Sequence, residues 1–533
     1  MSFRIGIDVG GTFTDFLVVG EGEEIIHKTS STPGDPSQGL LQGFDEIAEI
    51  LGRTREELLG QTTVIVHGTT VATNALLTRR GARVGLIGTK GFRDTLAIRD
   101  GAKESNYDND LQPPVPLVDR YLRMGIGGRI DAAGGEVEPL AVDELEQAVE
   151  HFRQEDVEAV AVCLLHSPTN PAHEHQARDV LAGLMPDVYA SVSVDLVPQI
   201  RYYDRLSTTV LNAYVGPIIS NYLGRLEGQL RDAGFGGVLL IMQSNGGVAT
   251  PVEVALLSVP ASGPASGLVA VRAHGLDHCL SVDMGGTSFD AALVKDGKPL
   301  VMSDGVIDRW RTALPMIDIH TIGAGGGSIA RVDEGGLLRV GPESAGASPG
   351  PACYRRGGER ATITDADLVL GYLDAETFLG GRMSLDLDAA RRVIEKDVAA
   401  PLGLDVGRAA AGIHNYANVA MAAGVREVTV RRGLDSRDFP LVVAGGAGPV
   451  HAAAIAAELE IPMLVVPRES SIFCAAGMLL SDFKHDHVVT MNRRLDEVTP
   501  EQLAEVWAEM EARGRATLER EGYSCYTTSA GWL

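Results

Sequence analysis

The stretch IGIDVGGTFTDF (residues 5–16) carries the clearest fold signal in this chain. Two isoleucines alternate with Gly6 and Asp8, as in a β-strand, and a pair of glycines then marks a tight turn. Apolar residues resume in FLVV (16–19) and lead to a second turn at Gly22. The pattern predicts a β-hairpin whose turn follows an aspartate at the end of the first strand.

A second copy of this turn occurs far along the chain. DVGGTFTD (8–15) and DMGGTSFD (283–290) are identical at five of eight positions, and each follows one short apolar run and precedes another. Glycines let a backbone approach a ligand closely, and successive N–H groups of such a turn form a concavity that suits an anion. A single copy is equally well explained as ordinary turn chemistry. Two copies, each behind a strand-end aspartate, favour two phosphate-binding hairpins that face each other across a cleft.

The aspartates at the strand ends, Asp8 and Asp283, suggest a metal ion. A carboxylate repels a phosphate, but it can hold a hydrated Mg²⁺ that bridges phosphate oxygens. We therefore expect both residues to order the metal through water and to act in catalysis.

A third glycine-rich stretch, VVAGGAGPVHAAAIA (442–456), separates an apolar strand from an Ala-rich helix. Paired glycines at the end of a strand let a flat ring pack against the backbone, as an adenosine requires, and Pro449 suits the first turn of a helix. The alternative is a helix N-terminus that merely packs closely. Two common nucleotide-binding motifs are excluded. The GGT turn leads into a strand and not a helix, which excludes a Rossmann dinucleotide loop, and the absence of a GxxxxGK[ST] motif excludes a P-loop.

Composition narrows the class of protein. The chain has 533 residues, 63 glycines and 45% apolar residues, which predicts an α/β protein of two or more domains. A formal net charge of −25 argues against nucleic-acid binding. Five well-separated cysteines without a CxxC pair argue against disulfides and a zinc knuckle. With no apparent leader and no membrane-spanning segment, we expect a cytoplasmic location.

The order of predicted elements suggests three regions. We expect a first lobe at 1–198, a second lobe at 199–490 and a C-terminal helical remnant at 491–533. The first contains a βαβ unit, and the second begins with a long helix despite Pro217. Residues 323–360 are rich in glycine and proline and show little periodicity, although GAGGGS within them is a candidate anion nest.

The order of two such hairpins and a glycine loop resembles the actin/hexokinase/sugar-kinase fold, a two-lobed, ribonuclease H-like α/β ATPase. More closely, the chain resembles the hydantoinase A/5-oxoprolinase family, which includes N-methylhydantoinase A subunits and subunits of acetone and acetophenone carboxylases. The resemblance runs from about residue 4 to about 490. Beyond the three glycine motifs, it includes HGTTVATNALLTRRGARVGLIGTKGFRD (67–94), MQSNGG (242–247), SGPASG (262–267) and TITDADLVLGYL (362–373).

This resemblance implies that the chain binds ATP with Mg²⁺ or Mn²⁺ in a cleft between two lobes. It also implies hydrolysis of a cyclic amide such as hydantoin, N-methylhydantoin, 5-oxoproline or a lactam, and assembly with a hydantoinase B-type subunit into a hetero-oligomer. The implied nucleotide-binding residues are Asp8, Gly10, Gly11, Thr12 and Thr14 in the first hairpin, Asp283, Gly285, Gly286, Thr287 and Ser288 in the second, and Gly445, Gly446 and Gly448 in the adenosine loop. Family members continue for well over a hundred residues past this endpoint, so we expect a shortened C-terminal region.

Two other functions stay open. One is an ATP-dependent ketone carboxylase subunit, which would use the same phosphorylation machinery. The other is a non-catalytic nucleotide switch of the kind found in reactivating chaperones of this fold.

Several polar residues outside the glycine motifs are weaker candidates. His67 and Asn74, in a predicted polar loop, either line the substrate or phosphate pocket or only make loop hydrogen bonds. Asp318 and His320 share a strand face, but two ligands do not make a metal site. The histidines of HSPTNPAHEH (166–175) are expected to be solvated residues at a helix start.

Overall fold

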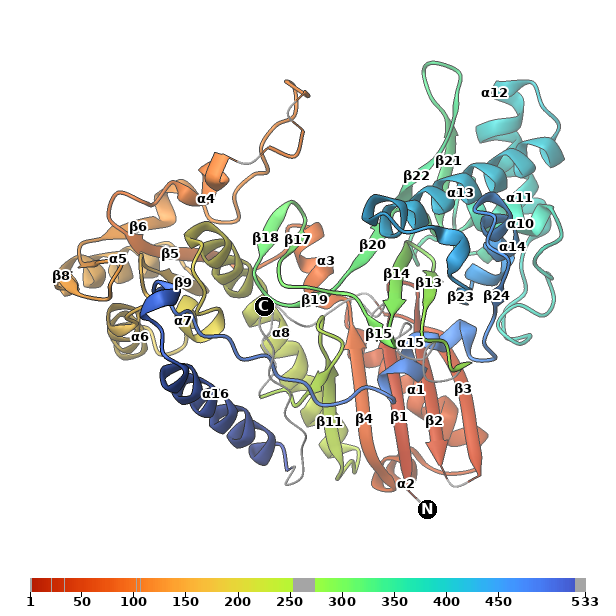
Figure 1. Ribbon diagram of the computed structural model, residues 1–533. Coiled ribbons are helices and arrows are strands. Elements are labelled where there is room, and N and C mark those ends of the chain that lie inside the picture. The colour runs from red at the N-terminus through yellow and green to blue at the C-terminus, as the bar shows by residue number, and fades with distance from the viewer. Residues whose placement is uncertain are drawn as a thin grey trace.

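The computed structural model describes residues 2–20, 22–32, 34–101, 103–105, 107–252 and 274–522. SGPASG (262–267), which contributes to the family resemblance, lies outside these residues. The described chain is a mixed α/β structure with two six-stranded sheets and one four-stranded sheet among its elements (Figure 1).

The first large sheet has the strand order β12-β11-β4-β1-β2-β3. Strands β1 and β2 form the predicted antiparallel hairpin, with Asp8 opposite Asp15, and β4 runs parallel to β1 on its other side. The strands are β1 (Phe3–Val9), β2 (Phe13–Gly20), β3 (Glu23–Ser30), β4 (Thr62–Thr69), β11 (Val238–Met242) and β12 (Val248–Ala249).

The second large sheet repeats this arrangement. Its order is β15-β14-β13-β23-β24, and β20 pairs with β14. Strands β13 and β14 form an antiparallel hairpin with Asp283 opposite Asp290, and β23 runs parallel to β13. The repeat read from the sequence is therefore also a repeat of topology and register. The strands are β13 (Cys279–Met284), β14 (Phe289–Lys295), β15 (Lys298–Pro299), β20 (Ile319–Ile322), β23 (Leu441–Ala444) and β24 (Leu464–Val465).

The third sheet is parallel throughout, in the order β10-β9-β5-β6. It contains the predicted βαβ unit, since β9 and β10 are parallel neighbours joined by a helix. Strand β6 was not predicted, because it follows a polar segment that reads as one long loop. The strands are β5 (Val84–Thr89), β6 (Arg123–Ile126), β9 (Ala159–Cys163) and β10 (Tyr189–Val192).

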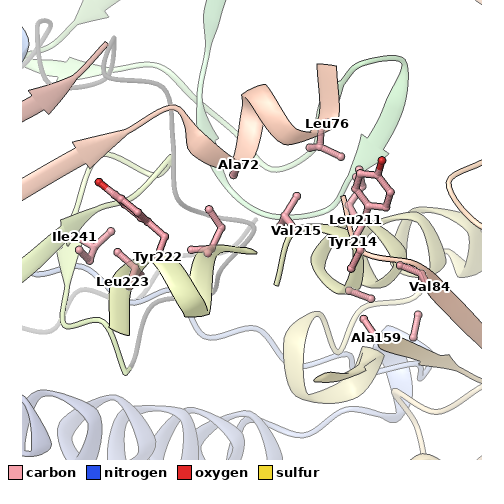
Figure 2. Close-up of a cluster of buried hydrophobic side chains, with 14 of the residues drawn as sticks. Ala72, Leu76, Val84, Ala159, Leu211, Tyr214, Val215, Tyr222, Leu223 and Ile241 are labelled. Carbon is pink, nitrogen blue, oxygen red and sulfur yellow. The ribbon is translucent and has the colours of Figure 1, made fainter. Parts of the chain in front are cut away.

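The helix α8 (Tyr202–Asp232) lies between the third sheet and the first large sheet and is buried along most of its length (Figures 1 and 2). Leu211 and Tyr214 lie beside Val84 and Ala159 of the parallel sheet, whereas Tyr222 and Leu223 lie toward Ile241 of β11 (Figure 2). The helix continues through Pro217, as predicted. It thereby joins two sheets into one hydrophobic core.

Several helices, long and short, begin at residues that cap them. Asp35, Thr54, Thr362, Asp405 and Thr499 each accept a hydrogen bond from a backbone N–H of the first turn. The other helices of the first half are α1 (Pro36–Ile50), α2 (Arg55–Gly60), α3 (Val71–Leu77), α4 (Thr95–Ile98), α5 (Val142–Gln154), α6 (Ala172–Leu184) and α7 (Ser193–Leu196). Those of the second half are α10 (Ile363–Val369), α11 (Leu387–Ile394), α12 (Ala400–Leu402), α13 (Val406–Val428), α14 (Gly448–Glu458), α15 (Phe473–Met478) and α16 (Pro500–Arg520).

Residues 323–360 contain a hairpin that the sequence did not predict. Its strands shift register between Ser328 and Ala330, which breaks the alternation that marks a strand. The strands outside the three sheets pair as β7 (Arg129–Ile130) with β8 (Glu136–Glu138), β16 (Val301–Met302) with β19 (Met316–Ile317), β17 (Gly305–Ile307) with β18 (Trp310–Thr312), and β21 (Ser328–Val332) with β22 (Leu338–Ser344).

The helix α15 connects the two large sheets. Its residues share a buried apolar cluster with Leu17 and Val66 of the first sheet and with Val442 and Ala444 of the second. A Cβ on Gly6 would lie 2.1 Å from the carbonyl oxygen of Ala475, so only glycine lets β1 pack this closely against α15. This packing holds the ends of the two hairpins near each other.

Among the residues that the structure describes, no helix has the length and apolar character needed to cross a membrane.

Candidate nucleotide site

The turns of the two repeated hairpins meet face to face. A Cβ placed on Gly286 would lie 2.5 Å from Oγ1 of Thr12, and one on Gly11 would lie 3.9 Å from Oγ1 of Thr287. Each turn therefore presents a glycine to the threonine of the other. The sequence predicted two hairpins that face each other across a cleft. The turns do face each other, but they are in direct contact.

The two turns are closed by the same hydrogen bond. The N–H of Gly10 donates to the carbonyl of Phe13 at 3.0 Å, and the N–H of Gly285 donates to that of Ser288 at 3.1 Å. The next two backbone N–H groups in each copy, those of residues 11–12 and 286–287, donate to no residue in the described part of the chain. Four backbone donors of two adjacent turns are therefore available to an anion.

Two hydroxyl side chains of the hairpins are used within the protein. Thr14 is fully buried and shares a hydrogen bond with Ser31, whose Oγ also donates to the carbonyl of Gly10 at 2.8 Å. Ser288 donates to Asp290 at 3.3 Å. Both hydroxyls brace the turns, and a direct contact to a ligand would require them to change partner.

The carboxylates at the strand ends gather around Cys474 of α15. Its Sγ donates to Oδ2 of Asp283 at 2.9 Å. Burial, followed by the charges of Asp283, Asp8 and Asp15, raises the pKa of this thiol well above its usual value. Burial likewise raises the pKa of Asp283, and the charge of Asp15 adds to this effect. The structure thus brings together the two predicted metal-binding aspartates, which the sequence separates by 275 positions.

The second aspartate of each hairpin, Asp15 or Asp290, has different binding partners for its carboxylate. Asp15 forms a partly buried ion pair with Lys28, its cross-strand neighbour on β3. Asp290 instead accepts hydrogen bonds from the hydroxyls of Thr321 and Ser288. Burial raises the pKa of Asp290 to about 6. Sequence reasoning missed Lys28, although a tight turn after Gly20 would have placed it opposite Asp15.

The GAGGGS loop is not an anion nest. The N–H groups of Gly326 and Gly327 donate to the carbonyls of Gly285 and Gly286 at 3.0 and 2.7 Å, and that of Gly325 donates to Ser328 Oγ. Because its donors are already used, the loop supports the second turn from behind. That prediction was wrong.

The third glycine loop lies against the end of β13. Gly445 has a φ of 84°, and a Cβ there would lie 2.2 Å from the carbonyl oxygen of Met284 and 2.4 Å from Oδ1 of Asp283. The N–H of Ala447 donates to the carbonyl of Met284 at 3.1 Å, and α14 begins at Gly448. The three glycine motifs therefore lie next to one another.

His67 and Asn74 occupy different environments. His67 lies on β4 and not in a loop, is fully buried, and its Nε2 bonds to the hydroxyl of Tyr222 at 2.9 Å. Burial lowers the pKa of His67 to about 4, so the ring is neutral at pH 7. Asn74 is exposed on α3 and donates to Thr70. A role of either residue in binding substrate stays a prediction.

The other polar candidates have structural partners. Asp318 forms an ion pair with Arg432, which accounts for it without a metal. His173 is buried and contacts Glu136 at 2.8 Å, so the expectation that the histidines near the start of α6 are solvated was wrong for this residue.

Sequence comparison identifies the family of this chain. The chain belongs to the hydantoinase/oxoprolinase family, because residues 4–184 match the model of the hydantoinase/oxoprolinase N-terminal region and residues 205–487 match that of hydantoinase/oxoprolinase.

The relatives of this chain include a caprolactamase subunit and a carboxylase subunit. The chain is 42% identical to caprolactamase subunit alpha of Pseudomonas jessenii, over 98% of this chain and 76% of that protein. It is 37% identical to the acetophenone carboxylase gamma subunit of Aromatoleum aromaticum, over 90% of this chain and 68% of that protein. The solved structure of the ATP-dependent caprolactamase from P. jessenii superposes with a TM-score of 0.84 at 42% identity, covering 98% of this chain and 77% of the other.

Proposed function

We propose that this protein is the ATP-binding subunit of an enzyme that hydrolyses a cyclic amide. The observation that carries the proposal is the contact between two D-x-G-G-T turns, whose four backbone N–H groups at residues 11–12 and 286–287 have no acceptor in the described part of the chain. Similarity to a caprolactamase subunit over nearly the whole chain supports the choice of substrate class.

ATP is needed because the nitrogen of a cyclic amide is a poor leaving group. Transfer of the γ-phosphoryl group to the amide oxygen releases ADP and leaves an electrophilic imidate phosphate. Water then adds to the carbon, the C–N bond breaks as the nitrogen takes up a proton, and a second water releases phosphate from the ring-opened product. The protein contributes positioning and charge stabilisation.

The residues suit these tasks. The N–H groups of Gly11, Thr12, Gly286 and Thr287 would hold the β- and γ-phosphates. The neighbouring Gly10 and Gly285 close the two turns, and the loop of Gly445, Gly446 and Gly448 would receive the adenosine.

Asp8 and Asp283 fit a magnesium or manganese ion. Both carboxylates act on Cys474, which places them close together, and oxygen donors are the ligands that such ions prefer. When bound, the ion would neutralise charge on the transferring phosphoryl group.

This chain would assemble with a partner subunit and bind the nucleotide between two lobes. The relatives named above include subunits of caprolactamase and acetophenone carboxylase, which supports a hetero-oligomer. We propose a hydantoinase B-type partner, with the nucleotide bound in a cleft between a first lobe (1–198) and a second lobe (199–490) of an actin/hexokinase-like fold.

A ketone carboxylase subunit is the second candidate, because the similarity to the acetophenone carboxylase subunit covers 90% of this chain. The two functions differ in the fate of bicarbonate. A carboxylase incorporates labelled bicarbonate into its product, whereas an amide hydrolase releases a free amine and carries no label.

The test is ADP release by the chain with its partner subunit. Hydantoin, N-methylhydantoin, 5-oxoproline and simple lactams would each be supplied with and without labelled bicarbonate. We expect one of them to stimulate ADP release and to yield a ring-opened amine. ATP-driven partner exchange without stimulation by any substrate would indicate a nucleotide switch instead.

Variants connect this activity to the site. Asp8→Asn and Asp283→Asn should each abolish substrate-dependent ADP release. Asp296→Asn is a matched control, because Asp296 lies at the far, exposed end of the second hairpin. Turnover by both site variants at the wild-type rate would contradict the proposed function.

A further inference from the structure

Asp367, His414 and His451 form a buried cluster that the nucleotide site does not use. They come from α10, α13 and α14, which gather beside the second large sheet (Figure 1). Nδ1 of His414 lies 2.8 Å from Oδ1 of Asp367, and Nε2 of His451 lies 3.3 Å from Oδ2 of the same carboxylate. All three potential ligand atoms lie within 4.8 Å of one another.

The orientation of His451 is fixed by its other nitrogen. Nδ1 lies 2.7 Å from Oδ1 of Asn418, and this orientation of the amide assigns the proton to Nδ1, while Nε2 points at Asp367. His451 is fully buried, and its Nε2 makes no hydrogen bond to any residue within the described ranges. A buried imidazole nitrogen and a carboxylate oxygen, each presenting a lone pair to the other, need a cation between them.

Protonation of both histidine rings would be unfavourable. His414 and His451 are stacked with their centroids 4.6 Å apart and their planes 21° apart. Two imidazolium rings at this distance would repel each other in a site with a single carboxylate. A single proton on Nε2 of His451 would pair that ring with the carboxylate, whereas one divalent ion would bind both nitrogens and the carboxylate at once.

We propose that Asp367, His414 and His451 bind one divalent first-row transition-metal ion, with Zn²⁺ as the reference ion. Two imidazoles and a carboxylate form a donor set typical of zinc, and tetrahedral ligands about 2.0–2.1 Å from zinc stand about 3.4 Å apart. The 3.3 Å between His451 and Asp367 matches this spacing, and the 2.8 Å between His414 and Asp367 would widen when the ion binds. Asn418 would orient His451 from outside, as hydrogen-bonding partners of metal-bound histidines commonly do.

This site differs from the proposed magnesium site. Mg²⁺ prefers oxygen ligands throughout, whereas this cluster offers two nitrogens. The inference stands without the proposed function, because it uses none of the residues assigned to the nucleotide. Tyr372 stacks on His414 and is 57% exposed, so the cluster lies one ring below the surface and an ion has a short path to it.

The position of the cluster indicates what the ion would do. His451 lies in the first turn of α14, directly after the third glycine loop. Asp367 lies on α10, where Thr364 donates to the carbonyl of Gly326, whose own N–H supports the second turn. An ion bound here would tie together the helices that stand behind two of the three glycine loops.

The experiment measures metal binding and stability and does not depend on turnover. The full chain, freed of any histidine tag and treated with a chelator, is loaded with Zn²⁺, separated by gel filtration and analysed for metal content. We expect one Zn²⁺ per chain, a higher unfolding temperature than in the metal-free protein, and visible d–d absorption after replacement with Co²⁺.

Variants assign the ion to the cluster. Asp367→Asn keeps an oxygen for His414, and His451→Gln keeps an amide in place of the ring, so both preserve much of the packing. Each should lose stoichiometric Zn²⁺ and the gain in unfolding temperature. His175→Asn is the matched control, because His175 forms a similar but exposed pair with Asp195, and it should bind Zn²⁺ as the wild type does.

Two results would overturn the proposal. Wild-type protein that retains far less than one Zn²⁺ per chain and shows no change in unfolding temperature would mean that a proton occupies the cluster. Folded Asp367→Asn and His451→Gln variants that keep full metal content would place the ion elsewhere. If both variants fail to fold, the wild-type stoichiometry and the Co²⁺ spectrum still decide between an ion and a proton.

Discussion

Gly285 and Gly286 offer a matched pair of substitutions that separates packing from ligand binding. Neither residue has a positive φ, so alanine fits the backbone at both positions. A Cβ on Gly286 would lie 2.5 Å from Oγ1 and 3.3 Å from Cβ of Thr12. A Cβ on Gly285 would meet no described atom within 4 Å.

These distances set opposite expectations for stability. Gly286→Ala overpacks the contact between the turns. The side chain of Thr12 is short and 7% exposed, so Thr12 cannot move out of the way. We therefore expect a loss of about 1–3 kcal/mol in the free energy of unfolding. Gly285→Ala should leave that free energy unchanged or raise it by about 0.4–1 kcal/mol, because alanine restricts the unfolded chain.

Nucleotide binding should respond to both substitutions. The open space beside Gly285 is where the proposed phosphates would lie, so its methyl group should weaken binding of a non-hydrolysable ATP analogue by about tenfold or more, equivalent to about 1.4 kcal/mol. Urea unfolding and isothermal titration calorimetry measure the two quantities on the same protein. A Gly285→Ala variant that is stable and binds the analogue with wild-type affinity would refute the assignment of this turn to phosphate.

Three further substitutions test individual side chains by urea unfolding. Asp290→Asn should have no effect on the free energy of unfolding below pH 4 and raise it by up to about 3 kcal/mol at pH 8. With a folded pKa of about 6 against the ordinary 3.8, the cost of Asp290 develops between pH 4 and 6 and is complete above pH 6. A constant difference across pH would contradict this. His67→Gln should reduce the loss of unfolding free energy between pH 6.5 and 4 by up to about 3 kcal/mol. In this range the unfolded histidine takes up a proton that the buried ring does not. An unchanged slope of stability against pH would exclude His67 as its source. Glu174→Ala should cost about 3–5 kcal/mol because it leaves the buried guanidinium of Arg205 without its carboxylate, and a loss below 1 kcal/mol would argue against that pair.

The hairpins were predictable because their signals are local. Alternation, the glycine pair and the strand-end aspartate all fall within about a dozen residues, and their repetition indicated that the two hairpins act together. The contact of Gly286 with Thr12 was not predictable in detail, because it depends on the packing of α15 between two sheets.

The features that the sequence did not predict depend on contacts between distant segments. GAGGGS has the composition of an anion nest, but its donors are used by carbonyls about 40 residues upstream, which no local pattern reveals. Asp367, His414 and His451 lie on three helices with no characteristic spacing, so the cluster is visible only once those helices are packed. Cys474 lies in an apolar run and gives no sign that it will contact Asp283.

The two copies of the turn are alike in backbone and unlike in charge. The first hairpin neutralises Asp15 with Lys28, whereas the second leaves Asp290 with hydroxyl partners only. Asp8 and Asp283 add two further carboxylates near the turns, and burial raises the pKa of Asp283. Ionised carboxylates at these positions would repel the charges of a nucleoside triphosphate. Under the proposed function, the divalent ion would therefore be required for ATP to bind at all, and the backbone N–H groups would select phosphate only once that ion has offset the carboxylates.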